Sequence, residues 1–140
     1  MYSYSELLNE FKSIGDELDN LIQKFPPERR EEVAFDKWSL KNVVSHLNHW
    51  MEHNINCLNC LVRAEIPYWQ PDIDEYNHNG VKIREKMTWD EVYIEFNILL
   101  QKQLQAYKTI PAILTESKFW DDRKHTPLSF LQDDIKHWRD

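Results

Sequence analysis

Glycine is scarce in this chain, with only two in 140 residues. Sheet-rich folds need glycine in their tight turns, so the scarcity predicts long helices and few hairpins. The two cysteines are too few for a disulfide framework, which favours a reducing compartment such as the cytoplasm. No apolar run approaches the ~18 residues of a membrane-spanning helix. The N-terminal MYSYSELLNEFK lacks the basic start and apolar core of a signal peptide.

Positive charge is also in short supply. Seventeen Lys and Arg residues stand against 24 Asp and Glu residues, which gives a formal net charge of −7. Nucleic acids and anionic membranes are bound by basic surfaces, so neither is an expected partner. The 41% apolar and 13% aromatic content instead predicts one packed domain over residues 1–140.

The stretch from Ser39 to Arg63 has the strongest helical pattern in the sequence. Ser39 is a good N-cap, and neither proline nor glycine interrupts the residues that follow. Helical spacing places an apolar face beside a second stripe made of Asn42, His46, His49, His53, Cys57 and Cys60. Asn54 falls within the apolar face, where an unpaired buried amide costs about 1–3 kcal/mol. We therefore expect Asn54 to pair with a facing helix or with water.

Three further helices are predicted from capping residues and proline stops. They run from Ser3/Glu6 to Pro26-Pro27, from Thr88/Glu91 to Pro111, and from Thr126-Pro127 to the end of the chain. Residues 65–86 are predicted to be an irregular connection that folds back as a lid, with a short helix near 81–86 as an option. No run has the alternation of a strand. Four amphipathic helices make an all-α four-helix bundle the expected fold.

Several short motifs occur along the chain in a fixed order. The segments are Trp38-Ser39-x-Lys41-x4-His46-Leu47-x2-Trp50, Tyr76-Asn77-x-Asn79, Met87 to Phe96, Phe119-Trp120 with Thr126-Pro127-Leu128, and Lys136-His137-Trp138-Arg139. The set resembles the ClbS/DfsB family of the DinB/YfiT-like superfamily of four-helix bundles. Trp138 departs from the tyrosine that the family has after its last histidine. The resemblance covers nearly the whole chain.

The resemblance implies an up-up-down-down bundle, with a long crossover loop between helices two and three and a site between the second and last helices. It also implies a hydrolase that opens an electrophilic small molecule in an aromatic-lined cavity. His46 would be the general base or a metal ligand, with Tyr76 and Asn77 orienting substrate or water. The expected cavity residues are Trp38, Trp50, Asn54 and Asn79. Ordinary core packing is the alternative for each tryptophan.

Members of the superfamily often bind a divalent metal through three histidines. His46 and His137 match two of them, and Asp133 stands where the third is expected. Two histidines and a carboxylate suit Zn, Ni, Mn or Fe and leave room for a bound water. The alternative is a structural His46 and a solvated Asp133.

Two other functions remain open alongside the hydrolase. One is a metal-dependent thiol transferase of the DinB-like type, and the other is a non-enzymatic bundle that binds a ligand or forms a homodimer. His49, His53, Cys57 and Cys60 also offer soft metal ligands, but one helix rarely closes a tetrahedral site alone. Structural roles for these four side chains are the favoured interpretation.

Overall fold

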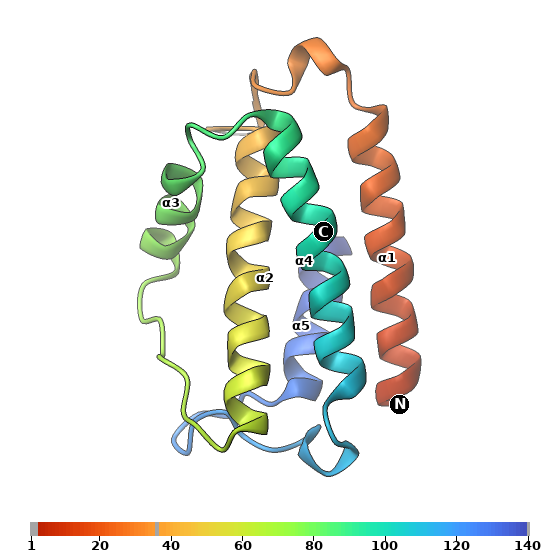
Figure 1. Cartoon of the computed structure of the whole chain (residues 1–140), viewed down its shortest axis with the longest axis vertical. Coiled ribbons are helices and arrows are strands. Elements are labelled where there is room, and N and C mark those ends of the chain that lie inside the picture. The colour runs from red at the N-terminus through yellow and green to blue at the C-terminus, as the bar shows by residue number, and fades with distance from the viewer. Residues whose placement is uncertain (1–2, 36, 140) are drawn as a thin grey trace.

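The computed structural model describes residues 3–35 and 37–139 and is mostly helical (Figure 1). Its elements are α1 (Tyr4–Lys24), β1 (Val33–Phe35), β2 (Trp38–Ser39), α2 (Leu40–Val62), α3 (Ile73–Ile83), α4 (Trp89–Thr109) and α5 (Pro127–Arg139), with 3-10 turns at Pro27–Arg29 and Ala112–Leu114. The predicted all-α class is confirmed. Within the described residues, no helix combines the length and the apolarity needed to cross a membrane.

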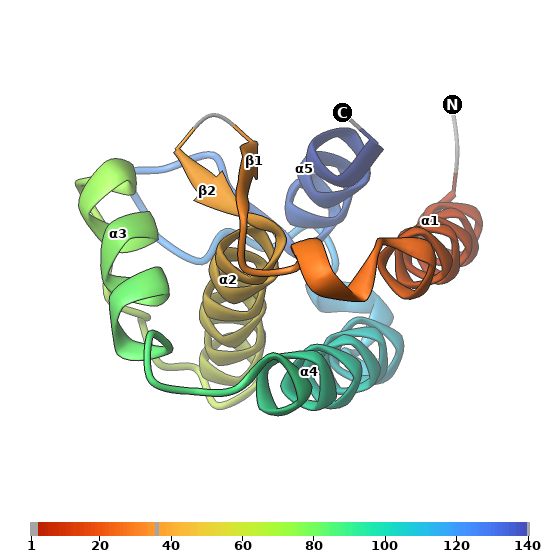
Figure 2. The same cartoon turned by 90° about the horizontal axis from the view of Figure 1, so that it is seen from above.

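The directions of the four bundle helices, α1, α2, α4 and α5, differ from the expected order. In Figure 1, α1 rises, α2 and α4 descend, and α5 rises, which makes the order up-down-down-up rather than up-up-down-down. The connection from α1 to α2 stays at one end of the bundle, so α2 must return antiparallel to α1. The connection from α2 to α4 runs back along the outside, so these two helices are parallel. Seen from above, α4 and α5 lie between α2 and α1 (Figure 2).

Capping chemistry sets the helix starts, as predicted. The Ser39 hydroxyl accepts from the backbone N–H of Asn42, whose side chain bonds the Ser39 N–H in return. Thr88 and Glu91 form the same reciprocal pair at α4. At α5 the Thr126 hydroxyl accepts from a backbone N–H of the first turn.

Two elements differ from the prediction. The first is α3, whose eleven residues, Ile73–Ile83, replace the irregular lid and begin earlier than the optional short helix near 81–86. Asp72 caps this helix, and its side chain accepts from the Glu75 N–H. The second is a short antiparallel ladder between β1 and β2, just before α2. Both were missed because α3 contains a glycine and follows two prolines, and because two- or three-residue strands are too short to show alternation.

Helix α3 is anchored to the bundle through the buried guanidinium of Arg84. This group donates to Glu95 at 2.7 Å, to Glu52 at 2.5 Å and to the Gly80 carbonyl at 3.2 Å. Its Nη1 also lies 3.1 Å from Nδ1 of His49. Burial and the adjacent guanidinium lower the pKa of His49 to about 4, so the ring stays neutral and accepts this bond. One cation therefore ties α3 to both α2 and α4.

Gly80 allows α3 to approach α2 closely. A Cβ at this position would lie 2.6 Å from Cβ of His49, closer than real contacts allow. We expect Gly80→Ala to lower the free energy of unfolding by about 1–3 kcal/mol through overpacking. This outweighs the intrinsic preference of helices for alanine, about 1 kcal/mol. Urea unfolding measures the loss, and Asn79→Ala, an exposed neighbour on α3, is the matched control. Equal stability of the two variants would contradict the close approach.

Candidate active site

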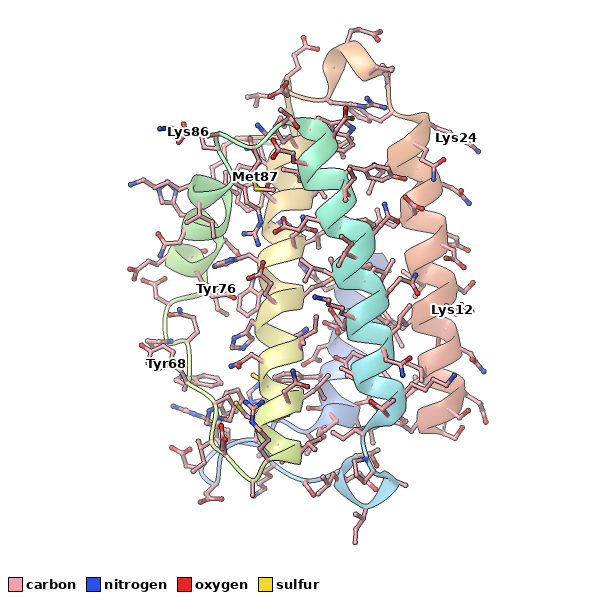
Figure 3. The ribbon with its side chains drawn as sticks, viewed as in Figure 1. Lys12, Lys24, Tyr68, Tyr76, Lys86 and Met87 are labelled. Carbon is pink, nitrogen blue, oxygen red and sulfur yellow. The ribbon has the colours of Figure 1, made fainter. Side chains whose placement is uncertain are left out.

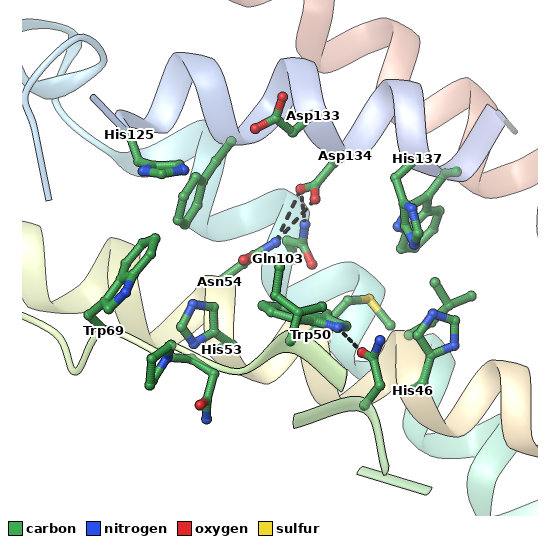
Figure 4. Close-up of a pocket in the computed structure, with 18 of the residues that line it drawn as sticks. His46, Trp50, His53, Asn54, Trp69, Gln103, His125, Asp133, Asp134 and His137 are labelled. Carbon is green, nitrogen blue, oxygen red and sulfur yellow. Dashed lines mark hydrogen bonds between the residues drawn. The ribbon is translucent and has the colours of Figure 1, made fainter. Parts of the chain in front are cut away.

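A cavity of about 410 Å³ lies between α2 and α5 (Figure 4). Gln103 of α4 forms its inner side, and residues 69–77 and the loop before α5 complete the wall. Its lining residues are His46, Leu47, Trp50, Met51, His53, Asn54, Trp69, Gln70, Pro71, Ile73, Asn77, Gln103, Trp120, His125, Phe130, Asp133, Asp134, His137 and Trp138. A mostly apolar and aromatic wall with a few convergent polar groups is typical of small-molecule sites.

Asp134 is the polar centre of this cavity. Its Oδ2 accepts from Gln103 Nε2 and from the Tyr107 hydroxyl, each at 2.7 Å, and its Oδ1 accepts from Asn54 Nδ2 at 3.1 Å. Burial raises the pKa of Asp134 to about 7, although these hydrogen bonds partly oppose the shift. The carboxyl therefore exchanges its proton near neutral pH. As predicted, Asn54 pairs with a polar group on a facing helix, which is Asp134 of α5.

Asp134 was missed in favour of its neighbour, Asp133. Asp133 lines the cavity but is exposed to solvent. A signal for Asp134 was present in the sequence, because this residue follows Leu131 by three positions and precedes Trp138 by four. That spacing places it on the apolar face of α5, where a carboxyl needs donors.

Two buried polar atoms of the lining residues lack partners within residues 3–35 and 37–139. One is Oε1 of Gln103, a fully buried side chain whose amide nitrogen is engaged by Asp134. The other is Nδ1 of His125. Because unpaired buried polar atoms are rare and costly, each is a candidate contact for a bound molecule.

His46 faces the same cavity from α2, as predicted. Its Nδ1 lies 2.6 Å from the Val43 carbonyl oxygen, which can only accept, so the proton of the neutral ring is on Nδ1. Within the described chain, Nε2 makes no hydrogen bond and keeps its lone pair. Burial, together with the nearby His137, lowers the pKa of His46 to about 4. The ring is therefore neutral across the physiological range.

The expected metal ligands do not form a metal site. The rings of His46 and His137 approach each other, with centres 6.0 Å apart, but Asp133 is exposed and no third ligand joins them among the described residues. Among the residues that the structure describes, no group of three or more His, Cys, Asp or Glu side chains is placed to hold a metal ion. The lining residues thus do not fit a divalent metal.

Tyr76 and Asn77 support the cavity wall rather than face the cavity together. Figure 3 places Tyr76 between α3 and α2, where its hydroxyl donates to the His49 carbonyl at 2.8 Å. Burial raises the pKa of Tyr76 above its usual range, so the hydroxyl stays protonated. Asn77 lines the cavity and accepts from Nε1 of Trp50, which packs against the Tyr76 ring. Both residues hold Trp50 in place.

Trp38 and Asn79 lie outside the main cavity. Trp38 packs against His46, with ring centres 4.7 Å apart and ring planes tilted by 38°, and it lines a second cavity of about 260 Å³. Asn79 is exposed on α3 and lines neither cavity. The residue of α3 that lies against α2 at this point is its neighbour Gly80. Trp50 and Asn54 do line the main cavity, as predicted.

The thiols of α2 are structural. Cys57 and Cys60 are buried and unbridged, and Cys57 Sγ lies 3.6 Å from Nε2 of His53. Burial raises the pKa of Cys57 to about 12, so the nucleophilic thiolate is not formed at neutral pH.

The charge of the cavity is one-sided. Its lining residues include Asp133, Asp134 and four histidines, but no lysine or arginine.

No protein-family model, curated protein or solved structure matches this chain. The residues of the cavity are therefore the basis for assigning a function.

Proposed function

We propose that this protein is a hydrolase of the ClbS/DfsB type, built on a DinB-like bundle, which adds water to an electrophilic small molecule in the main cavity. One observation supports this most strongly. His46 and Asp134 line the same apolar cavity, and their pKa values are displaced in opposite directions, to about 4 and about 7. Such opposed shifts assign a base and an acid within one site.

In the proposed reaction, His46 is the general base. Its Nε2 lone pair takes a proton from water as the water oxygen bonds to the electrophilic carbon. The bond between that carbon and its leaving atom breaks, and the electron pair stays on the leaving atom. Asp134, in its protonated form, supplies the proton that this atom needs. The Asp134 proton is on Oδ1, because Oδ2 already accepts two short hydrogen bonds. Exchange with solvent restores both groups, so the net change is the addition of one water.

Trp50, Trp69 and Trp120 would surround the apolar part of the substrate and exclude bulk water. Asn77 and Tyr76 act through Trp50 and are positioning residues. Since the lining residues do not fit a metal, no step is assigned to one.

The test is a search for water addition at several pH values. Purified protein is incubated with epoxides, aziridines and activated cyclopropanes, and mass spectrometry detects products heavier by one water. The rate should be highest between pH of about 4 and about 7, because His46 must be neutral and Asp134 protonated. It should fall as the pH rises above about 7. The groups packed around Asp134 are the neutral donors Asn54, Gln103 and Tyr107 and the neighbouring Asp133.

Asp134→Asn removes the acid and should remove the decline at alkaline pH together with most of the rate. Asp133→Asn is the matched control: it should keep most of the rate, and the decline should move to lower pH because the Asp133 charge helps to raise the pKa of Asp134. Binding of these compounds without water addition would reject the hydrolase and identify a ligand-binding bundle instead. A rate that increases above pH 7 would reject Asp134 as the acid.

A further inference from the structure

The two oxygens of Asp134 are used unequally. Oδ2 receives short bonds from Gln103 and Tyr107, whereas Oδ1 receives only the longer bond from Asn54 at 3.1 Å. A carboxylate has about four lone-pair sites. Oδ1 therefore has the capacity to accept another donor, and the donor has to come from the cavity that Asp134 lines.

A second acceptor belongs to the same cluster. The amide nitrogen of Gln103 is bonded to Asp134, so its Oε1 belongs to the amide that touches the carboxylate. This oxygen is buried and has no partner among the described residues. Turning the Gln103 amide over would place its Oε1 against Oδ2 of Asp134, and both of these oxygens are acceptors. The cluster thus fixes a buried acceptor beside a carboxylate, inside the wall of a cavity.

We propose that the molecule bound in this cavity carries a basic nitrogen that, once protonated, has two N–H groups. One N–H is donated to Oδ1 of Asp134 and the other to Oε1 of Gln103. That this nitrogen is the leaving atom rests on the proposed hydrolysis. That the ligand is an amine rests on the cavity alone. Whether the proton starts on the amine or on Asp134, the bound state is an ammonium paired with a carboxylate.

Counting hydrogens separates nitrogen from oxygen. A protonated ring nitrogen offers two N–H donors, which match the two acceptors. The hydroxyl formed from an epoxide oxygen offers one, which would leave Gln103 Oε1 unpaired. Leaving a buried polar atom unpaired is a strong penalty against the wrong ligand.

The rest of the cavity suits a ligand that carries a positive charge on an apolar ring system. No lysine or arginine lines it, so no cationic side chain of the cavity wall competes with the ligand for Asp134. Trp50, Trp69, Trp120 and Phe130 line the same space, and aromatic rings attract cations, as the Arg123 guanidinium over the Trp69 ring illustrates. An aromatic or alicyclic amine is therefore the fitting class.

Unreactive probes test this class without turnover. Isothermal titration calorimetry compares 2-naphthylmethylamine, its N,N-dimethyl derivative and 2-naphthylmethanol, which share one ring system. We expect the primary amine to bind at least about tenfold tighter than the alcohol, with the dimethylamine between them, since it has one N–H when protonated. Asp134→Asn should abolish the preference for amines, while Asp16→Asn, which removes an exposed carboxylate of α1 that lines neither cavity, should keep it.

Equal affinity for the amine and the alcohol would overturn the proposal, as would an amine preference that survives in Asp134→Asn. Equal affinity for the primary and dimethyl amines would overturn the role of Gln103 Oε1. The preference within the unsubstituted protein needs no variant, so a poorly folded Asp134→Asn protein does not block the test. Amine preference without any water addition would reject the hydrolase and keep this ligand class. Hydrolysis without amine preference would do the reverse.

Discussion

Replacing His46 with alanine should lower the rate of water addition by about 10²–10⁴-fold, the usual contribution of a general base. The reason is the free Nε2 lone pair, which the Val43 carbonyl fixes by holding the ring proton on Nδ1. The helix should remain intact, because alanine is a strong helix former and His46 lies at the edge of the core. Circular dichroism and the melting temperature verify the fold, and product formation measures the rate.

The matched control is His137→Ala, which removes an imidazole from the opposite side of the same cavity. We expect this change to reduce the rate by less than about tenfold, since general-base catalysis is assigned to His46 alone. A metal held between the two rings would instead give equal losses. An unchanged rate in His46→Ala would remove the base from the mechanism.

Replacing Arg84 with methionine should destabilise the protein by about 3–5 kcal/mol, as expected when one partner of a buried ion pair is removed. The guanidinium is the shared donor to Glu52 and Glu95, and its own side chain is only 3% exposed. Without it, Glu95 is left partly buried near a second carboxylate. Urea unfolding gives the free energy, and hydrogen exchange should show α3 opening at lower energy than α2.

Lys82→Met is the control for this change, because it removes a cation from the exposed face of the same helix. It should alter stability by less than about 0.5 kcal/mol. If Arg84→Met were equally mild, the anchoring of α3 would have to come from other contacts, such as the approach of Gly80 to His49.

The long helices could be predicted from the sequence because their signals are local. A cap such as Ser39 or Thr88 and a stop such as Pro111 act within one turn, and the helices begin or end beside them. The direction of the helices depends on where each connection runs, which no local pattern records. This is why the bundle is up-down-down-up and not the expected order.

The site was predicted only in part, and for the same reason. His46, Trp50 and Asn54 lie on one strongly patterned helix, so their faces could be assigned in advance. The choice between Asp133 and Asp134 depended on a rotation of about 100° around α5, which a short helix with few apolar residues defines weakly. Gln103 follows Leu99 by four positions and precedes Tyr107 by four, so spacing places it on the apolar face of α4, but its partner on α5 could not be predicted from this pattern.

Residues 69–77 form one wall of the cavity from outside the four-helix bundle. Gln70 and Ile73 in this segment touch the cavity, yet neither belongs to the apolar cluster that stabilises the bundle. Changes at these two positions would therefore alter what the protein accepts without weakening the scaffold. Leu47, Met51, Trp120 and Phe130, by contrast, belong to both the cavity wall and the core, so a change of ligand selectivity is least costly in the segment outside the bundle.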